Sequence, residues 1–219
     1  FCTSAAAGIL AALLLAPFQE LGRFFFILNA GLAFLFLCLS APYRLSSQAA
    51  GSAGSILALL AMALVMAYLA ALLILRRGRS SRGLLVTAAA VALVTAAADG
   101  RMAAGAPGPG WAFGLNAVGA SALLGSVIVG MLLGHWYLVR TRLDVSHLVV
   151  FARFFAAAVI GRAVLFVAGL IGAASRSSSG MEMFLKTTAV DRGFFFWQRV
   201  LFGLLGPAAF AFMVHETAR

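Results

Sequence analysis

The apolar run over residues 53–75 constrains the fold of this chain more than any other feature, because it contains no charged residue. A helix rises 1.5 Å per residue, so about 20 apolar residues are enough to cross the roughly 30 Å of hydrocarbon in a bilayer. Hydrocarbon offers no hydrogen-bond partners, so a crossing segment must satisfy its own backbone polar groups, as a helix does. This run therefore predicts a transmembrane helix.

Comparable apolar runs recur along the whole chain. The sequence is 63% hydrophobic and 10% charged, whereas a soluble domain is about 45–50% apolar and about 25% charged. The runs are much longer than the roughly 10-residue alternating strands of a membrane β-barrel. We therefore predict an all-α protein, a polytopic integral membrane helical bundle that forms a single transmembrane domain over residues 1–219, without a soluble domain. About seven transmembrane helices are expected, over residues 3–18, 24–41, 53–75, 83–105, 111–139, 147–174 and 193–215.

The fourth run is interrupted near its end by Asp99, Gly100 and Arg101. A helix that stopped at Ala98 would have only about 15 residues and would be short for a bilayer. We therefore expect the helix to continue through the interruption toward Gly105, which places Asp99 within the membrane depth.

Basic residues dominate the connections between the runs. The chain carries 16 Lys and Arg against 6 Asp and Glu, a formal net charge of +10, and four of the arginines fall in the short loop over residues 76–82. Short loops rich in Lys and Arg face the cytoplasm, so we place this loop there. We expect a multi-pass protein of a bacterial inner (cytoplasmic) membrane. Its cations would contact anionic lipid headgroups, and no nucleic-acid partner is expected.

The three histidines fall at one depth in this topology. His135 ends the fifth run, His147 begins the sixth and His215 ends the seventh, all toward the cytoplasm. Imidazoles from different helices can ligate a b-type haem or contact a quinone head group, with Arg153 as a counter-charge. The alternative is an interfacial belt, in which His135 and the aromatic residues after it anchor a helix end and Arg153 extends toward the headgroups. No metal-ligand spacing is present, so no separate metal site is predicted.

A second set of polar residues lies deeper in the runs. Arg162 falls near the membrane midplane, where a charge is costly and usually paired. Asp99 is the acid inside an apolar run, and Arg199 enters from the same outer side. We predict an intramembrane pair of Asp99 with Arg162 or Arg199, and a proton or ion path through Asp99 is the functional version of that pair. Gly130 and Gly134 form a GxxxG spacing that would permit close helix contact.

No nucleotide-binding loop or hydrolase motif is present. We expect an integral membrane subunit of a multi-protein membrane complex of the redox or energy-transducing kind. Its role would be electron transfer with haem b or quinone contact, or scaffolding, and the chain would not be catalytic by itself. Its partners would be bound lipids and other membrane protein subunits. A small transporter or channel with an intramembrane Asp/Arg pair is the alternative, and a membrane enzyme of lipid metabolism is the third class.

The predicted topology can be tested by labelling single cysteines in a variant in which Cys2 and Cys38 are replaced by Ala. Ser80→Cys and Ser178→Cys lie in loops that follow an odd and an even number of predicted crossings. A membrane-impermeant maleimide should therefore label them from opposite sides of sealed vesicles. Labelling of both from one side would contradict the topology.

Overall fold

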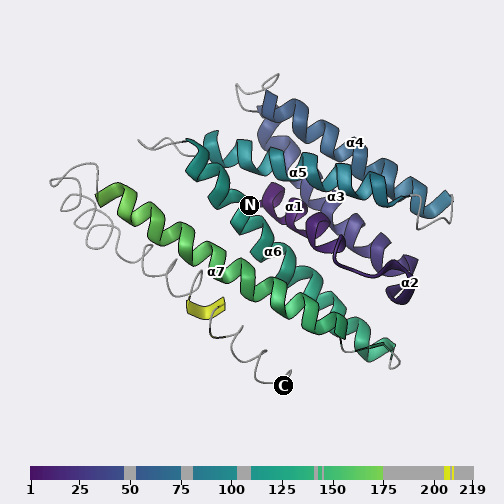
Figure 1. The fold of residues 1–219 in the computed structure, drawn as a ribbon. Coiled ribbons are helices and arrows are strands. Elements are labelled where there is room, and N and C mark those ends of the chain that lie inside the picture. The colour runs from purple at the N-terminus through teal and green to yellow at the C-terminus, as the bar shows by residue number, and fades with distance from the viewer. Residues whose placement is uncertain are drawn as a thin grey trace. The chain divides into compact units, whose positions relative to one another are not determined.

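In the described part of the chain every regular element is a helix, as the all-α prediction requires. The structure is a computed structural model. It describes residues 1–46, 53–74, 81–102, 110–140, 143–144, 146–174, 205–207 and 209. No strand occurs in these residues. The helices are α1 (Cys2–Leu13), α2 (Phe18–Leu21), α3 (Arg23–Ser46), α4 (Ala53–Ile74), α5 (Arg82–Met102), α6 (Gly110–Val139) and α7 (Ser146–Ala174), as drawn in Figure 1.

Five of these helices, α3 to α7, are long and apolar enough to cross a membrane. The chain is therefore a multi-pass membrane protein. The crossing segments are Arg23–Pro42, Ala53–Ile74, Arg82–Met102, Trp111–Val139 and Ser146–Ala168. They agree with the predicted spans over residues 24–41, 53–75, 83–105, 111–139 and 147–174. The predicted span over residues 193–215 lies outside the described residues, apart from residues 205–207 and 209.

The predicted first span differs from the structure. Instead of one helix over residues 3–18, α1 ends at Leu13, and the short helix α2 begins at Phe18 after an extended Pro17. Proline lacks a backbone N–H and clashes with the preceding helical turn, so it separates the two helices. Gly22 then adopts a φ of 78°, a conformation that favours glycine, and the chain turns into α3.

The helix α5 passes through the interruption at Asp99. It ends at Met102, so the prediction that the helix does not stop at Ala98 is confirmed. Asp99 occupies the last turn of α5 and is half-buried.

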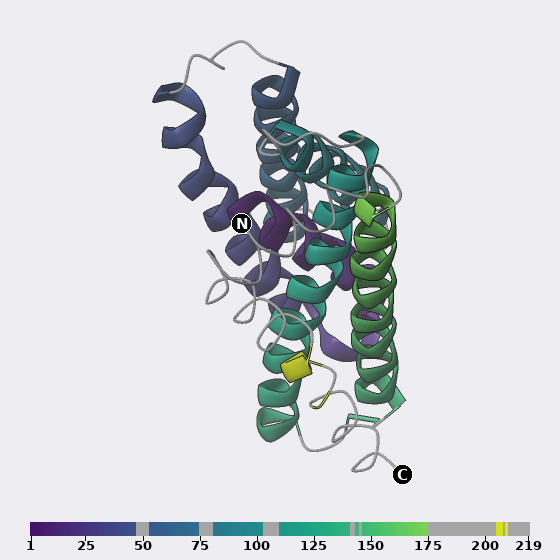
Figure 2. The same cartoon turned by 90° about the vertical axis from the view of Figure 1, so that its left-hand side faces the viewer.

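The chain divides into two compact units, Phe1–Phe154 and Phe155–Arg219. The helix α7 begins in the first unit and continues into the second. Much of the second unit lies outside the described residues, so a single domain over residues 1–219 stays a prediction. In the first unit α1 is central: it packs against α3, α5 and α6 (Figures 1 and 2). Most of its side chains are buried, and α4 covers α3 and α5.

The backbones of α1 and α6 are in direct contact at two glycines. A Cβ atom added to Gly8 would lie 1.9 Å from the carbonyl oxygen of Ser121, and one added to Gly125 would lie 2.0 Å from the carbonyl oxygen of Gly8. Only glycine fits such an approach. The GxxxG pair Gly130 and Gly134 does not serve this purpose in the described chain, because nothing lies within 4 Å of a Cβ at either position. The spacing alone does not show which glycines meet a neighbouring helix.

This contact generates a prediction with a control on the same helix. Gly125→Ala should lower the free energy of unfolding by about 1–3 kcal/mol, the usual cost of forcing an extra carbon into a packed interior. Gly130→Ala adds the same methyl group in open space, so it should be neutral or stabilise the helix by up to about 1 kcal/mol. The unfolding midpoints in mild detergent measure both, and equal effects would contradict the packing.

Candidate functional site

The ends of α4 and α6 lie beside α2 at one end of the first unit, which we call the α2 end. Arg23, the first residue of α3, donates a hydrogen bond of 3.3 Å to the carbonyl oxygen of Leu72 near the end of α4. Arg140, just after α6, donates one of 3.2 Å to the carbonyl oxygen of Glu20 in α2. The ends of α4 and α6 therefore lie on the same side of the first unit as α2, as the predicted alternation of crossings requires. Its assignment to the cytoplasm stays a prediction.

An acid–imidazole contact joins α2 to the start of α7. The Oε2 atom of Glu20 lies within hydrogen-bond distance of Nε2 of His147, although the two residues are far apart in sequence. A neutral imidazole with its proton on this nitrogen donates to the carboxylate, and a protonated one forms an ion pair. His147 is mostly buried and Glu20 is half-exposed. The contact therefore ties the beginning of α7 to the first unit.

Asp144 determines where α7 begins. Its Oδ1 atom accepts a hydrogen bond of 3.1 Å from the backbone N–H of Ser146, the first residue of α7. A short acidic side chain before a helix satisfies a backbone donor that has no partner within the helix. The hydrogen bonds from the backbone and the hydroxyl of Ser146 hold the pKa of the Asp144 carboxyl below its usual value. The hydroxyl of Tyr137 donates to the carbonyl oxygen of Asp144, which links this turn to α6.

Trp136 connects the end of α6 with the beginning of α3. Its ring stacks on Phe24 with centroids 5.8 Å apart and an interplanar angle of 16°. It also meets Phe25 edge-on at 5.8 Å. The indole Nε1 atom is buried and has no hydrogen-bond partner among the described residues. A buried Trp N–H usually finds an acceptor.

A second buried polar group lies on α3, one turn after Phe25. Asn29 is fully buried, and its Nδ2 donates a hydrogen bond of 2.9 Å to the carbonyl oxygen of Phe25. Its Oδ1 atom has no hydrogen-bond partner within the described part of the chain. The sequence predicts neither unpartnered atom, since both depend on which neighbours surround the side chain.

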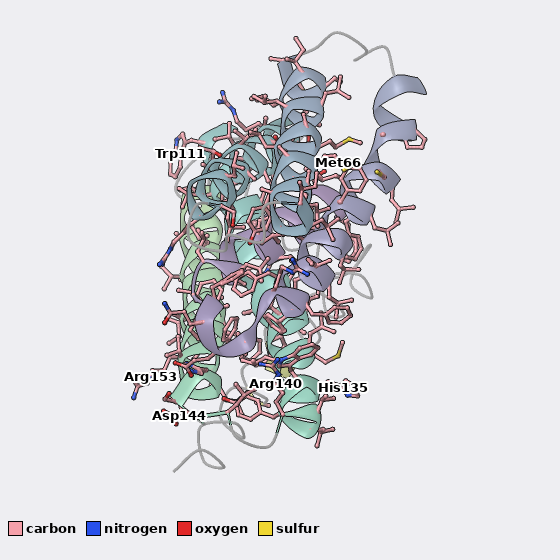
Figure 3. The ribbon with its side chains drawn as sticks, turned by 90° about the vertical axis from the view of Figure 1, so that its right-hand side faces the viewer. Met66, Trp111, His135, Arg140, Asp144 and Arg153 are labelled. Carbon is pink, nitrogen blue, oxygen red and sulfur yellow. The ribbon has the colours of Figure 1, made fainter. Side chains whose placement is uncertain are left out.

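The structure describes three of the four predicted cofactor residues, His135, His147 and Arg153. His135 and His147 do belong to the same end of the first unit, but His147 contacts Glu20 while His135 is exposed. In Figure 3, His135 points to the side away from Asp144 and Arg153. Arg153 is itself exposed on α7, and His215 lies outside the described residues. Among the described residues no group of three or more His, Cys, Asp or Glu side chains could hold a metal ion. A haem or quinone contact stays a prediction.

The predicted charge pair is divided among different parts of the chain. Asp99 belongs to the first unit and Arg162 to the second. Arg199 lies outside the described residues. The pair of Asp99 with either arginine therefore stays a prediction.

Sequence reasoning missed the role of Glu20. In the sequence this residue is only one of the polar groups that close the first apolar run, and no spacing links it to His147 or Arg140. The available signal was indirect: with 16 Lys and Arg against 6 Asp and Glu, an acid at a helix end is more often near a basic side chain than near another acid.

Comparisons of the chain with known protein families, with curated proteins and with solved structures find no match. A functional proposal must therefore rest on the geometry of the chain itself.

The contact between Glu20 and His147 can be tested by a double-mutant cycle. His147→Ala and Glu20→Gln should each lower the free energy of unfolding by about 0.5–1 kcal/mol, the range for partly exposed polar pairs. The double variant should lose less stability than the sum of the two single losses, because the first change already breaks the contact that the second would remove. His135→Ala is the control and should leave stability unchanged. Unfolding in mild detergent measures all four variants, and additive losses would contradict the contact.

Proposed function

We propose that the chain is an integral membrane subunit of a multi-protein membrane complex, redox or energy-transducing in kind, in a bacterial inner (cytoplasmic) membrane. The main support is the use of the polar groups at the α2 end. Glu20, Arg140, His147 and Asp144 are engaged with one another or with backbone groups that join helices. Groups used in this way stabilise a helical framework, which favours a structural role within a larger assembly.

Of the two histidines that the structure describes at this end, His135 remains available for a partner. It is exposed one turn before the end of α6, whereas Nε2 of His147 is occupied by Glu20. A pairing of these two histidines as haem ligands does not fit this arrangement. His135 fits a single contact better, either with a quinone head group, with a haem b whose other ligand comes from elsewhere, or with another subunit. Such a cofactor would supply electron transfer, and this chain would orient it.

A small transporter or channel is the second candidate. The observation that favours it is Asp99, an acid that is half-buried in the last turn of a crossing helix, two residues before Arg101. Acids within membrane segments often belong to ion or proton pathways.

Purification of the tagged chain from its native membrane in mild detergent tests the first proposal. We expect other membrane subunits to copurify and the preparation to show a haem spectrum or quinone-linked turnover. His135→Ala should remove that signal or reduce it at least tenfold while the complex still assembles. Leu138→Ala, an exposed residue of the same helix end, is the control. A chain that purifies alone, colourless and inactive with quinones, would contradict the proposal.

In that case proton uptake by vesicles that contain the chain, compared with the Asp99→Asn variant, would test the transporter instead.

A further inference from the structure

Two side chains of α6 extend to one short segment at the beginning of α3. The backbone N–H of Arg140 donates a hydrogen bond of 2.9 Å to the carbonyl oxygen of Trp136, so helical geometry continues to Arg140 and the two residues lie one turn apart on one face. Trp136 packs on Phe24 and Phe25, and the Arg140 guanidinium contacts the carbonyl oxygen of Glu20 and lies 3.5 Å from the place that a Cβ of Gly22 would take. Residues of the segment 20–25 therefore contact both Trp136 and Arg140.

Each of these two side chains has donors without an acceptor in the described part of the chain. Nε1 of Trp136 is buried and unpartnered, and a buried donor without a hydrogen bond is unfavourable. A guanidinium has five N–H donors, and the hydrogen bond from Arg140 to the carbonyl of Glu20 uses one nitrogen. Arg140 is also exposed, so its remaining donors can reach a molecule outside the chain. Both side chains require oxygen acceptors.

An exposed apolar stripe on α3 begins beside this pair. Phe24, which stacks on Trp136, is 63% exposed, and the residues that follow it on the same face are also exposed: Leu28, Leu35 and Leu39. From Phe24 to Leu35 the helix rises about 16 Å, close to half of the roughly 30 Å hydrocarbon thickness. That is the depth of one leaflet, which a single acyl chain covers.

We propose that an anionic phospholipid binds along α3 at the α2 end, as a specific ligand of the chain. Its phosphate accepts hydrogen bonds from the Arg140 guanidinium, whose planar donors match phosphate oxygens. An acyl ester carbonyl, which lies just below the phosphate, accepts from Nε1 of Trp136 when the exposed Phe24 ring that stacks on the indole moves aside, because this nitrogen is buried in the chain without lipid. The acyl chain lies along Phe24, Leu28 and Leu35. The order of donors and apolar groups from the helix end inward is the order of phosphate, ester and hydrocarbon in a phospholipid.

The charge around the site favours an anion. Within residues 20–25 the acid is Glu20, and its carboxylate is held by His147 on α7. Arg23 lies in the same segment and adds a second guanidinium, although one of its nitrogens is used by the carbonyl oxygen of Leu72. Arg140 and Arg23 together outweigh the single carboxylate, so this end of the chain carries a net positive charge that favours an anion.

Native mass spectrometry of the delipidated full chain tests this proposal. Titration with phosphatidylglycerol should give binding about tenfold tighter than titration with phosphatidylcholine, and Arg140→Ala should remove that preference. Arg101→Ala, an exposed arginine in the last turn of α5, is the matched control and should retain it. Equal effects of the two arginine variants would overturn the proposal.

The role of Trp136 is tested by changing the lipid as well as the protein. Trp136→Phe keeps an aromatic ring and removes the N–H. It should therefore lower the affinity for ester-linked phosphatidylglycerol by about threefold to tenfold, the contribution of one hydrogen bond. Diether phosphatidylglycerol has no ester carbonyl, so the wild type should bind it as weakly as the variant binds the ester lipid. The variant should bind the diether lipid with the same affinity as the wild type does. Trp111→Phe, at the start of α6, should change neither affinity.

Two results would overturn this part of the proposal. The first is that Trp136→Phe lowers the affinity for the ester lipid and for the diether lipid equally. That result would show that the N–H donates to no carbonyl of the lipid. The second is saturation of the Trp136-dependent site by a short-chain quinone but not by phosphatidylglycerol, which would assign the carbonyl to a quinone. Neither result bears on whether the chain copurifies with other subunits, so the two proposals succeed or fail separately.

Discussion

The contact between the backbones of α1 and α6 at Gly8 and Gly125 is the constraint on which the first unit depends. Lipid tails are as apolar as leucine, so helices in a membrane associate through close packing rather than through exclusion of water. The two glycines bring α1 against α6 until their backbones touch. With α1 held there, α3 and α5 pack on its remaining sides. The position of α1 therefore fixes the turn that follows it, and that turn carries Glu20.

The polar contacts of the α2 end follow from this placement. Because α1 leads directly into α2, the carboxylate and carbonyl of Glu20 come within reach of His147 and Arg140 at the two ends of the α6–α7 connection. Each contact is worth little where water can compete. Together they join the start of α7 to a unit whose other helices are held by packing, and Phe151 adds a buried aromatic side chain. Packing sets the positions of the helices, and the polar groups then fix where the next helix begins.

Much of the fold was predictable because hydrocarbon thickness acts on each helix separately. The run over residues 53–75 needs no knowledge of its neighbours to be assigned as a crossing, and the same holds for the helix that continues through Asp99. The break after Leu13 was harder to place, although Pro17 was visible, because a proline inside an apolar run can either kink a helix or end it. Pro42 lies inside α3, which continues to Ser46, whereas the sequence had suggested an end at residue 41.

The site was less predictable because it depends on contacts between distant residues. The histidines could be placed at one end from topology alone, yet a shared depth does not determine which partner each ring meets. His147 contacts an acid from the first connection, while His135 on the preceding helix is exposed. The glycines show the same difficulty: Gly125 meets α1, and Gly130, which has the better-known spacing, meets nothing within 4 Å. Local sequence determines which side chains a helix carries, and the arrangement of the neighbouring helices determines which of these side chains make contacts.

Asn29 and Trp136 show how position decides the meaning of an unpartnered polar atom. Both atoms are buried without a hydrogen-bond partner in the described chain, and each such group is costly in a low-dielectric interior. Asn29 is enclosed within α3 and its neighbours, where a buried water is the small molecule that can supply the missing donor. Trp136 lies near the end of a crossing helix and beside an exposed phenylalanine, where the lipid that we propose would meet it. Asn29 therefore needs only a buried water as its partner, whereas Trp136 would find its missing acceptor in the proposed lipid.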